Sequence, residues 1–230
     1  MISKFKAITK GSRIIDQIFR ELLIILKTQK GLTELKLAHY IRRQAKQLGA
    51  QDMAFPPIVA FGKGSGQVHH FPTNARIAKN NFLMLDYGVK INGYCSDFTR
   101  TLFLGRPKTI HEKIYNIVLK SQLAAIKKIV PGTFSDQIDF AARHIINRSG
   151  FGPYFTHGTG HGVGKKIHEP PSFKTNTNDK LTRNLIVTVE PGIYLPNKFG
   201  VRIEDMVLVL NQPKVFSKIP KDFPSIIIKA

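Results

Sequence analysis

The chain has 230 residues, of which 42% are hydrophobic, so it can bury the core of one large α/β domain or of two small ones. We expect a single domain spanning residues 1–230. The chain has one cysteine, Cys95, which excludes a disulfide framework and a thiolate zinc site and favours a reducing, cytoplasmic location.

The charge is strongly basic, because 35 Lys and Arg residues against 15 Asp and Glu residues give a formal net charge of +20. Such a charge could indicate a nucleic-acid or anionic-membrane partner. However, the lysines are scattered over nearly every segment, and no motif of a nucleic-acid-binding domain is present. We therefore expect a solvated basic surface and no nucleic-acid function. The longest apolar run, Leu22 to Leu26, is too short to cross a bilayer, and no secretory signal is expected.

Two helices are predicted first. Apolar residues recur at spacings of three and four from about Gly11 to Lys27, and again from Thr33 to a stop at Gly49. Residues 58–61 then form a short apolar strand, and a glycine-rich loop leads to His69 and His70. A histidine pair before a proline turn is more often a loop feature than a functional one.

The next segment is apolar from Phe82 to Leu85 and ends at Asp86, and a return strand from Ile91 to Leu104 contains Asp97. A carboxylate directly after a fully apolar strand is costly unless it is paired or bound to a metal. Asp86 could also serve as a turn former ahead of Gly88. For Asp97 this simpler explanation is weaker, because strand alternation places it on a polar face.

The second half repeats this order of elements. Helical patterns cover residues 109–130 and about 138–150, and an apolar strand over residues 185–189 stops at Glu190. A final strand from Val201 to Leu210 carries Glu204. Two halves of the same helix-helix-hairpin plan, related by a pseudo-twofold axis, would bring Asp86, Asp97, Glu190 and Glu204 together.

The stretch from Thr156 to Pro170 places His157, His161 and His168 among four glycines at alternate positions. Each glycine costs a helix about 1 kcal/mol relative to alanine, whereas a strand or loop that something approaches closely favours glycine. On this stretch alone, a metal or proton-transfer site and a glycine-rich surface loop are equally good interpretations. Four carboxylates in one site would repel each other and raise their pKa values, and divalent cations with His161 as a nitrogen ligand would remove that repulsion.

Four motifs carry a resemblance to a known family. D-Y-G-V-K-I-N-G-Y-C-S-D-F-T-R-T, T-H-G-T-G-H-G-V-G-K-K-I-H-E-P, V-E-P-G-I-Y and V-R-I-E-D-M resemble the catalytic domain of the aminopeptidase P, prolidase and methionine aminopeptidase superfamily. The resemblance runs from the first helix to about Leu210 and implies the α+β pita-bread fold around a curved antiparallel sheet. The forms E-P-G-I-Y and V-R-I-E-D favour the aminopeptidase P and prolidase branch over the methionine aminopeptidases.

The resemblance also implies a site. Asp86 would bind one divalent metal ion, His161 and Glu190 would bind a second ion, and Asp97 and Glu204 would bridge both. A bridging hydroxide would be the nucleophile, its pKa lowered by the two ions. Mn²⁺ suits these ligands best, with Co²⁺, Fe²⁺ and Zn²⁺ as alternatives.

Further residues receive roles through the same resemblance. His69 and His168 match the substrate-side histidines, and Glu190 is a candidate for proton transfer. His157 would line the pocket or orient a neighbouring group, and Tyr194 and Arg202 would contact substrate. Arg202 shares a strand face with Glu204 and could pair with a carboxylate. The alternate glycines would let the backbone pass close to the metal ions and a peptide.

The function implied is a dinuclear metal-dependent aminopeptidase that removes an N-terminal residue, preferably before proline. Activity of the methionine aminopeptidase type and a non-catalytic binding protein with a basic surface are the alternatives. The family's usual N-terminal domain is expected to be absent, because the sequence begins almost at the first helix of the resemblance. A peptide is the expected partner, and a homodimer is an open alternative to a monomer.

Overall fold

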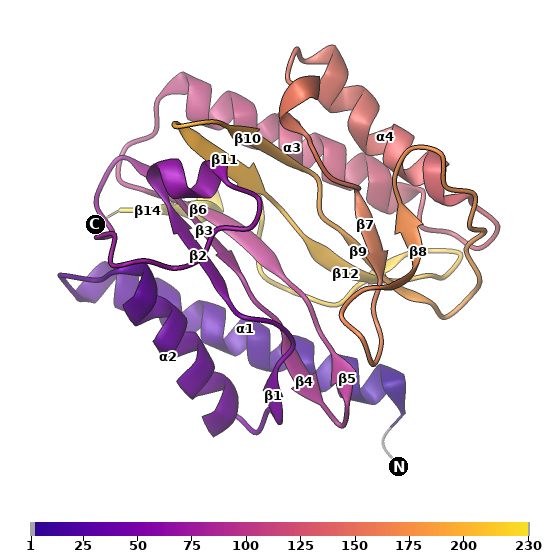
Figure 1. Ribbon diagram of the computed structural model, residues 1–230, viewed down its shortest axis with the longest axis horizontal. Coiled ribbons are helices and arrows are strands. Elements are labelled where there is room, and N and C mark those ends of the chain that lie inside the picture. Colours follow the sequence, from indigo (N-terminus) through magenta and orange to yellow (C-terminus); the bar gives the residue numbers. More distant parts are fainter. Residues whose placement is uncertain (1–2, 230) are drawn as a thin grey trace.

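Two helices begin the part of the chain that the computed structural model describes, residues 3–229 (Figure 1). Helix α1 spans Lys4–Thr28 and α2 spans Glu34–Gln47. The side chains of Ser3 and Thr33 accept hydrogen bonds from backbone N–H groups in the first turns and so cap both helices.

The predicted start of the first helix at Gly11 is wrong. Ala7 and Ile8 are fully buried and extend the apolar face of α1 by a further turn. A Cβ at Gly11 would lie 2.8 Å from the Ser96 hydroxyl oxygen. Gly11 therefore allows α1 to lie close to the chain around Ser96 and does not mark the start of a helix.

The first main sheet has the order β14-β6-β3-β2, and β3 pairs antiparallel with β6 from Asn81 opposite Leu104 to Asp86 opposite Thr99. A smaller sheet of order β1-β4-β5 is formed by segments of the same half of the chain. The bounds are β1 Asp52–Met53, β2 Ile58–Phe61, 3-10 helix η1 Gly62–Gly66, β3 Asn81–Asp86, β4 Val89–Ile91, β5 Tyr94–Cys95, β6 Thr99–Leu104 and β14 Ile227–Ile228.

The single return strand predicted from Ile91 to Leu104 is wrong. Asn92 and Gly93 both adopt positive φ angles, 48° and 77°, and form a tight turn between β4 and β5. Asp97 lies in the short segment between β5 and β6. The chain therefore passes from the smaller sheet to the first main sheet at Asp97.

The second half contains helices α3 and α4, a sheet of order β13-β12-β9-β7-β8 and the hairpin β10-β11. The predicted strand from Val201 to Leu210 is divided in two, and Glu204 lies at the division. The bounds are α3 Thr109–Lys127, α4 Ser135–Arg148, η2 Gly152–Tyr154, β7 Gly160–Gly162, β8 Glu169–Phe173, β9 Ile186–Val189, β10 Gly192–Leu195, β11 Phe199–Arg202, β12 Asp205–Leu208, β13 Lys214–Val215 and η3 Pro224–Ile226.

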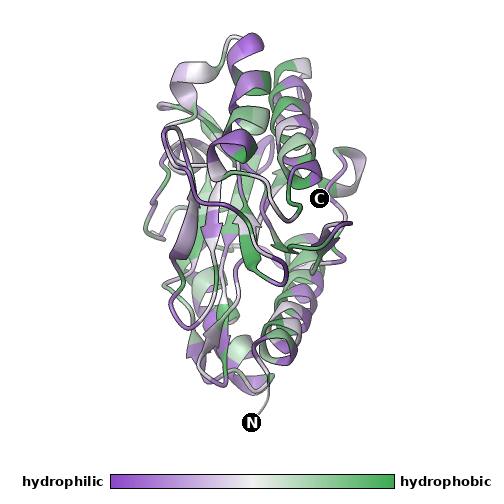
Figure 2. Cartoon of the chain, turned by 90° about the vertical axis from the view of Figure 1, so that its right-hand side faces the viewer, coloured by the Kyte–Doolittle hydropathy of each residue, from purple (hydrophilic) through white to green (hydrophobic). Residues whose placement is uncertain are grey.

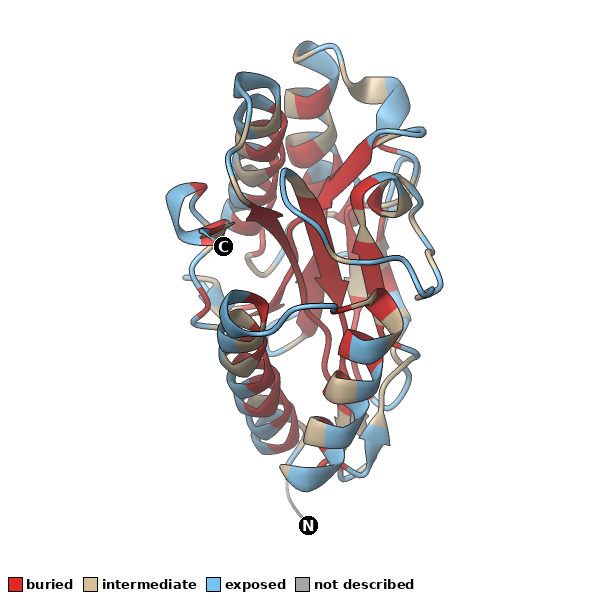
Figure 3. Cartoon of the chain, turned by 90° about the vertical axis from the view of Figure 1, so that its left-hand side faces the viewer, coloured by how far each residue is buried: buried red, intermediate tan, exposed pale blue. Residues whose placement is uncertain are grey.

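The helices pack against the strands in two main apolar clusters. The largest cluster joins α1, α2 and the first half of α3 to the first sheet and to the hairpin β10-β11, and a second cluster joins the end of α3 and α4 to β9 and β12. Figures 2 and 3 show the hydrophobic and buried residues on the inner helix faces and along the strands, with exposed residues outside. The expected α+β class with two helix-helix-hairpin halves is confirmed. None of the helices in residues 3–229 is long and apolar enough to cross a membrane.

The two main sheets meet at one backbone bridge. Thr99, the first residue of β6, pairs with Glu204, whose N–H donates to the Thr99 carbonyl over 3.1 Å. Asp86 is opposite Thr99 in the first sheet, and Asp205 is opposite Val189 in the second. This junction therefore brings the polar ends of the two hairpins to the same place.

Candidate metal centre

The five predicted ligand residues come from five separate segments and line one pocket of about 750 Å³. Asp86 ends β3, Asp97 precedes β6, Glu190 follows β9 and Glu204 precedes β12, while His161 is the central residue of β7. His69, His157, His168 and Arg202 line the same pocket. The structure therefore brings together the ligand set and the predicted pocket histidines.

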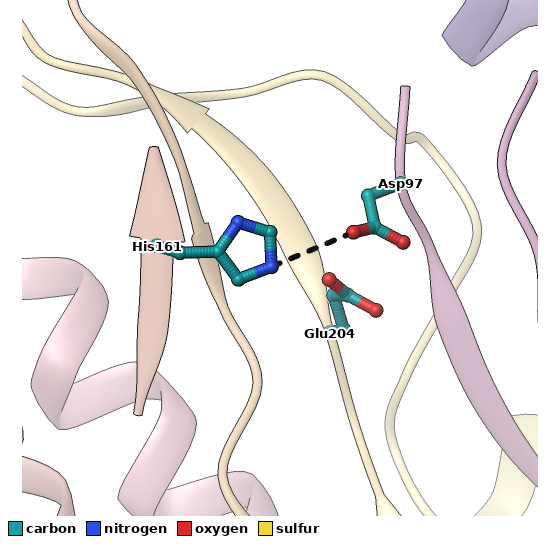
Figure 4. Close-up of side chains that lie close together, drawn as sticks. All are labelled: Asp97, His161 and Glu204. Carbon is teal, nitrogen blue, oxygen red and sulfur yellow. Dashed lines mark ion pairs between the residues drawn. The ribbon is translucent and has the colours of Figure 1, made fainter. Parts of the chain in front are cut away.

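Three of these residues already have the spacing of a metal site. Asp97, His161 and Glu204 each offer a ligand atom, and the three atoms lie within 4.8 Å of one another (Figure 4). His161 Nε2 lies 3.2 Å from Glu190 Oε1 and 3.7 Å from Asp97 Oδ2. The imidazole thus faces two carboxylates across the junction of the sheets.

Two buried carboxylate oxygens fit a site for cations. Within residues 3–229, Asp86 Oδ1 and Glu204 Oε1 have no hydrogen-bond partner although both atoms are buried. Burial without a partner costs a polar group about 1–3 kcal/mol, and more if it is charged. Four carboxylates and one imidazole also match the ligand preference of divalent ions such as Mn²⁺. The residues present therefore fit a divalent metal site.

The carboxylates also repel one another. Burial raises the pKa of Asp97 well above its usual range, and the charge of Asp86 raises it further. Burial and the charge of Asp97 do the same to the pKa of Glu204. Without cations, the site can therefore hold its full negative charge only at a cost in free energy.

His161 and Glu190 form an ion pair. Burial lowers the pKa of His161, but the hydrogen bond and charge of Glu190 outweigh it and raise this pKa to about 9. Burial raises the pKa of Glu190, but His161 outweighs it and brings the value to about 2. His161 Nδ1 lies 3.0 Å from the Gly162 carbonyl oxygen, which leaves Nε2 to face the carboxylates. The proton on Nε2 is therefore the one that a metal ion would replace.

Arg202 pairs with Asp86, as its strand position predicted. Its guanidinium is buried and also donates to the Tyr194 hydroxyl over 2.8 Å and to the Val68 carbonyl over 3.3 Å. Burial raises the pKa of Tyr194 to about 12, so the hydroxyl keeps its proton. That proton points to His157 Nε2, 2.8 Å away. Tyr194 therefore connects Arg202 to His157, and contact of any of the three with substrate stays a prediction.

His168 lies against the ligand set. Its ring centroid is 4.4 Å from that of His161, in an edge-to-face arrangement. Burial and the positive charge of His161 lower the pKa of His168. Burial likewise lowers the pKa of His157, whose Nδ1 lies 2.8 Å from the Gly158 carbonyl. Both rings therefore favour the neutral form, which can donate one hydrogen bond and accept another.

Comparison with known proteins decides the family. The model of metallopeptidase family M24 matches residues 6–211. The chain belongs to metallopeptidase family M24. The resemblance found in the sequence is confirmed, and the fold is the pita-bread fold of this family.

Several relatives of this M24 chain are known. An uncharacterized peptidase of Staphylococcus aureus (strain USA300) is 38% identical over 205 residues, which cover 89% of this chain and 58% of that protein. The crystal structure of a prolidase from Thermococcus sibiricus has a TM-score of 0.91 and 38% identity, covering 97% of this chain and 60% of the other. An Xaa-Pro dipeptidase from Bacillus anthracis has a TM-score of 0.93 and 36% identity, covering 99% and 63%. The chain thus spans about three fifths of the length of these relatives.

The sequence interpretation missed residues that contact the predicted ligand Glu204. The Thr99 hydroxyl donates to Glu204 Oε2 over 2.6 Å. Arg100 is 1% exposed, donates to the Glu204 carbonyl and forms a 2.7 Å ion pair with Asp205. An arginine inside a predicted buried strand was the signal, because a buried charge needs a partner. These contacts fix the backbone and one oxygen of Glu204.

Two of the alternate glycines have a packing reason, and their predicted role beside metal ions and a peptide stays a prediction. A Cβ at Gly160 would lie 2.1 Å from the Thr188 carbonyl oxygen, and one at Gly162 would lie 2.3 Å from that of Pro170. Neighbouring backbone therefore occupies the space that a side chain would need. The glycines allow close packing around β7 and so set the position of His161.

Proposed function

We propose that this M24 domain is a metal-dependent aminopeptidase that hydrolyses the N-terminal peptide bond of peptides, with a preference for Xaa-Pro. The observation that carries the proposal is the convergence of four carboxylates and His161 in one pocket, where Asp86 Oδ1 and Glu204 Oε1 are buried without a hydrogen-bond partner among residues 3–229. The match to family M24 supports the same chemistry.

In this proposal Asp86, Asp97, His161, Glu190 and Glu204 hold two divalent ions, with Mn²⁺ the proposed metal. Such ions, when bound, would lower the pKa of a water molecule and polarise the scissile carbonyl group. Thr99 and Arg100 hold Glu204 in place, and Arg202 holds one oxygen of Asp86. These contacts leave the other carboxylate oxygens free to bind metal.

His168 and His69 are the proposed groups on the substrate side. A neutral His168, whose pKa is lowered, can donate a hydrogen bond to the carbonyl oxygen of the scissile bond as negative charge develops there. His69 lines the same pocket as His168. Glu190 is the proposed carrier of a proton to the leaving amine.

The preference for proline has two supports. Solved relatives at 30–38% identity are described as a prolidase, an Xaa-Pro dipeptidase and an X-Pro aminopeptidase, the last from Thermotoga maritima MSB8 with a TM-score of 0.92. The lining of the pocket also includes apolar side chains that suit a pyrrolidine ring: Phe55, Pro56, Pro57, Ile58, Val68 and Ile167. A single domain over residues 1–230, a cytoplasmic location and a homodimer stay predictions.

The test is a peptide panel with metal-free protein reconstituted with Mn²⁺, Co²⁺, Fe²⁺ or Zn²⁺. We expect release of the first residue from Ala-Pro and Ala-Pro-Ala, slower release from Ala-Ala-Ala, and no turnover without metal or by Asp97→Asn. Preferential release of Met from Met-Ala-Ser would assign methionine aminopeptidase specificity instead. Absence of turnover on every peptide with every metal would refute the proposed activity.

A further inference from the structure

The loop that follows η1, residues 67–80, contributes three consecutive residues to the lining of the pocket, His69, His70 and Phe71. Phe71 is 77% exposed, whereas the side chain of His70 is only 10% exposed and turns towards α2. The position of His70 therefore bears directly on where its neighbour His69 lies.

The group that receives His70 is Glu34, the first residue of α2, whose side chain is 1% exposed. Glu34 Oε2 lies 2.9 Å from His70 Nε2, and it accepts hydrogen bonds from the N–H of Thr73 over 2.9 Å and from the Thr73 hydroxyl over 2.8 Å. Glu34 Oε1 accepts from the N–H of Phe61 over 2.7 Å. One buried carboxylate thus connects α2 to the end of β2 and to the loop that contains His69.

Packing and polar contacts hold the His70 ring beside this carboxylate. A Cβ at Gly64 would lie 2.9 Å from His70 Cε1, so η1 packs directly against the ring. His70 Nδ1 lies 3.4 Å from the side-chain oxygen of Gln67. The backbone also holds the loop, because the N–H of Leu35 donates to the Thr73 carbonyl over 3.0 Å. The ring is therefore fixed on two sides.

We propose that Glu34, His70 and Thr73 form a positioning cluster that holds the loop so that His69 faces the substrate; this inference rests on the proposed function. Glu34 and His70 act through the backbone of the loop. Ordering a loop residue costs conformational entropy, and the four hydrogen bonds on Glu34 offset that cost before substrate binds. A displacement of about 1 Å at a catalytic group can reduce a rate about a hundredfold, so a partial loss of order has a measurable effect.

The experiment compares His70→Ala with His70→Gln, whose amide can still donate to Glu34, and with His39→Ala, an exposed histidine on α2, as the matched control. We expect His70→Ala to lower kcat/KM on Ala-Pro-Ala about tenfold. His70→Gln should regain most of that loss, and the control should match the unmodified protein. Mn²⁺ affinity should change less than twofold in all three variants.

A double-variant cycle separates positioning from a direct role. If His70 acts through His69, His69→Ala combined with His70→Ala should be within twofold of His69→Ala alone. A further tenfold loss in the double variant would overturn the inference. Amide hydrogen exchange supplies a readout without activity, and we expect exchange at Thr73, whose N–H donates to Glu34, to accelerate at least tenfold in His70→Ala.

The exchange measurement also distinguishes the two proposals. If the unmodified protein hydrolyses no peptide, the proposed function fails and exchange alone decides on the cluster. Faster exchange at Thr73 in His70→Ala, with normal exchange in His39→Ala, would support it. Unchanged exchange in His70→Ala would overturn it.

Discussion

Asp97→Asn should change the stability of the protein in opposite directions with and without metal. The substitution keeps the shape of the side chain, and the amide oxygen can still accept the hydrogen bond from the Phe98 N–H, which Asp97 Oδ1 accepts over 3.0 Å. It removes one negative charge from a site that contains four carboxylates. The metal-free protein should therefore become more stable, although the variant should lose its metal-dependent activity.

The magnitude follows from the geometry. The ligand oxygens of Asp97 and Glu204 lie within 4.8 Å of each other. Two unit charges at about 5 Å repel by about 3 kcal/mol at an effective dielectric constant of about 20. Because the pKa values of both groups are raised, protonation relieves part of this repulsion, and we expect about 1 kcal/mol of stabilisation. For a chain of this size that corresponds to an increase in Tm of about 2–4 °C.

With bound metal, the unmodified protein should be more stable than Asp97→Asn. An ion present at about 100 times its Kd stabilises the folded state by about 2.7 kcal/mol, or about 5–10 °C in Tm. We expect this increase in the unmodified protein and less than half of it in Asp97→Asn, measured by thermal unfolding with EDTA and with Mn²⁺. A metal-free variant less stable than the metal-free unmodified protein, or an undiminished response to Mn²⁺, would refute the reasoning.

Three further predictions concern the same pocket. In EDTA, Tm should fall from pH 6 to pH 9. The pKa values of Asp97 and Glu204 are raised in the folded state, and that of His161 is raised to about 9, so protonation of these groups stabilises the fold and this stability is lost as they release protons. Mn²⁺ should make Tm less dependent on pH. Arg202→Met should destabilise the metal-free protein by about 3–5 kcal/mol, because it leaves the buried Asp86 carboxylate without its cation; a chemical denaturation curve that does not change would contradict this. Gly160→Ala should destabilise by about 1–3 kcal/mol and weaken Mn²⁺ binding, because its Cβ would displace backbone beside His161; normal metal affinity would show that the strand tolerates the change.

The positions of Asp86 and Glu190 could be predicted because the sequence pattern that indicates them is local. Asp86 and Glu190 each end an apolar strand, and the same order of elements occurs twice, so their convergence followed from the repeat. The strand breaks at Asp97 and Glu204 were missed because buried residues continue through both breaks. The sequence Asn92-Gly93 was the available sign of the turn between β4 and β5.

The sequence pattern could not predict contacts between segments that are far apart in the chain. Thr99 and Glu204 are 105 residues apart, and Glu34 and Thr73 are 39 residues apart. Glu34 follows the N-cap Thr33, so its position in the sequence is that of an ordinary acid in the first turn of a helix. Only the fold brings it under the loop of His69.

The number of metal ions bound by each chain tests the central claim most directly. Isothermal titration of Mn²⁺ into metal-free protein, with elemental analysis after desalting, should give two ions per chain for the unmodified protein. The double variant Asp97→Asn and Glu204→Gln, which lacks both proposed bridging carboxylates, should retain fewer than one. Absence of Mn²⁺, Co²⁺, Fe²⁺ and Zn²⁺ binding to the unmodified protein would contradict the account, as would equal binding by the double variant.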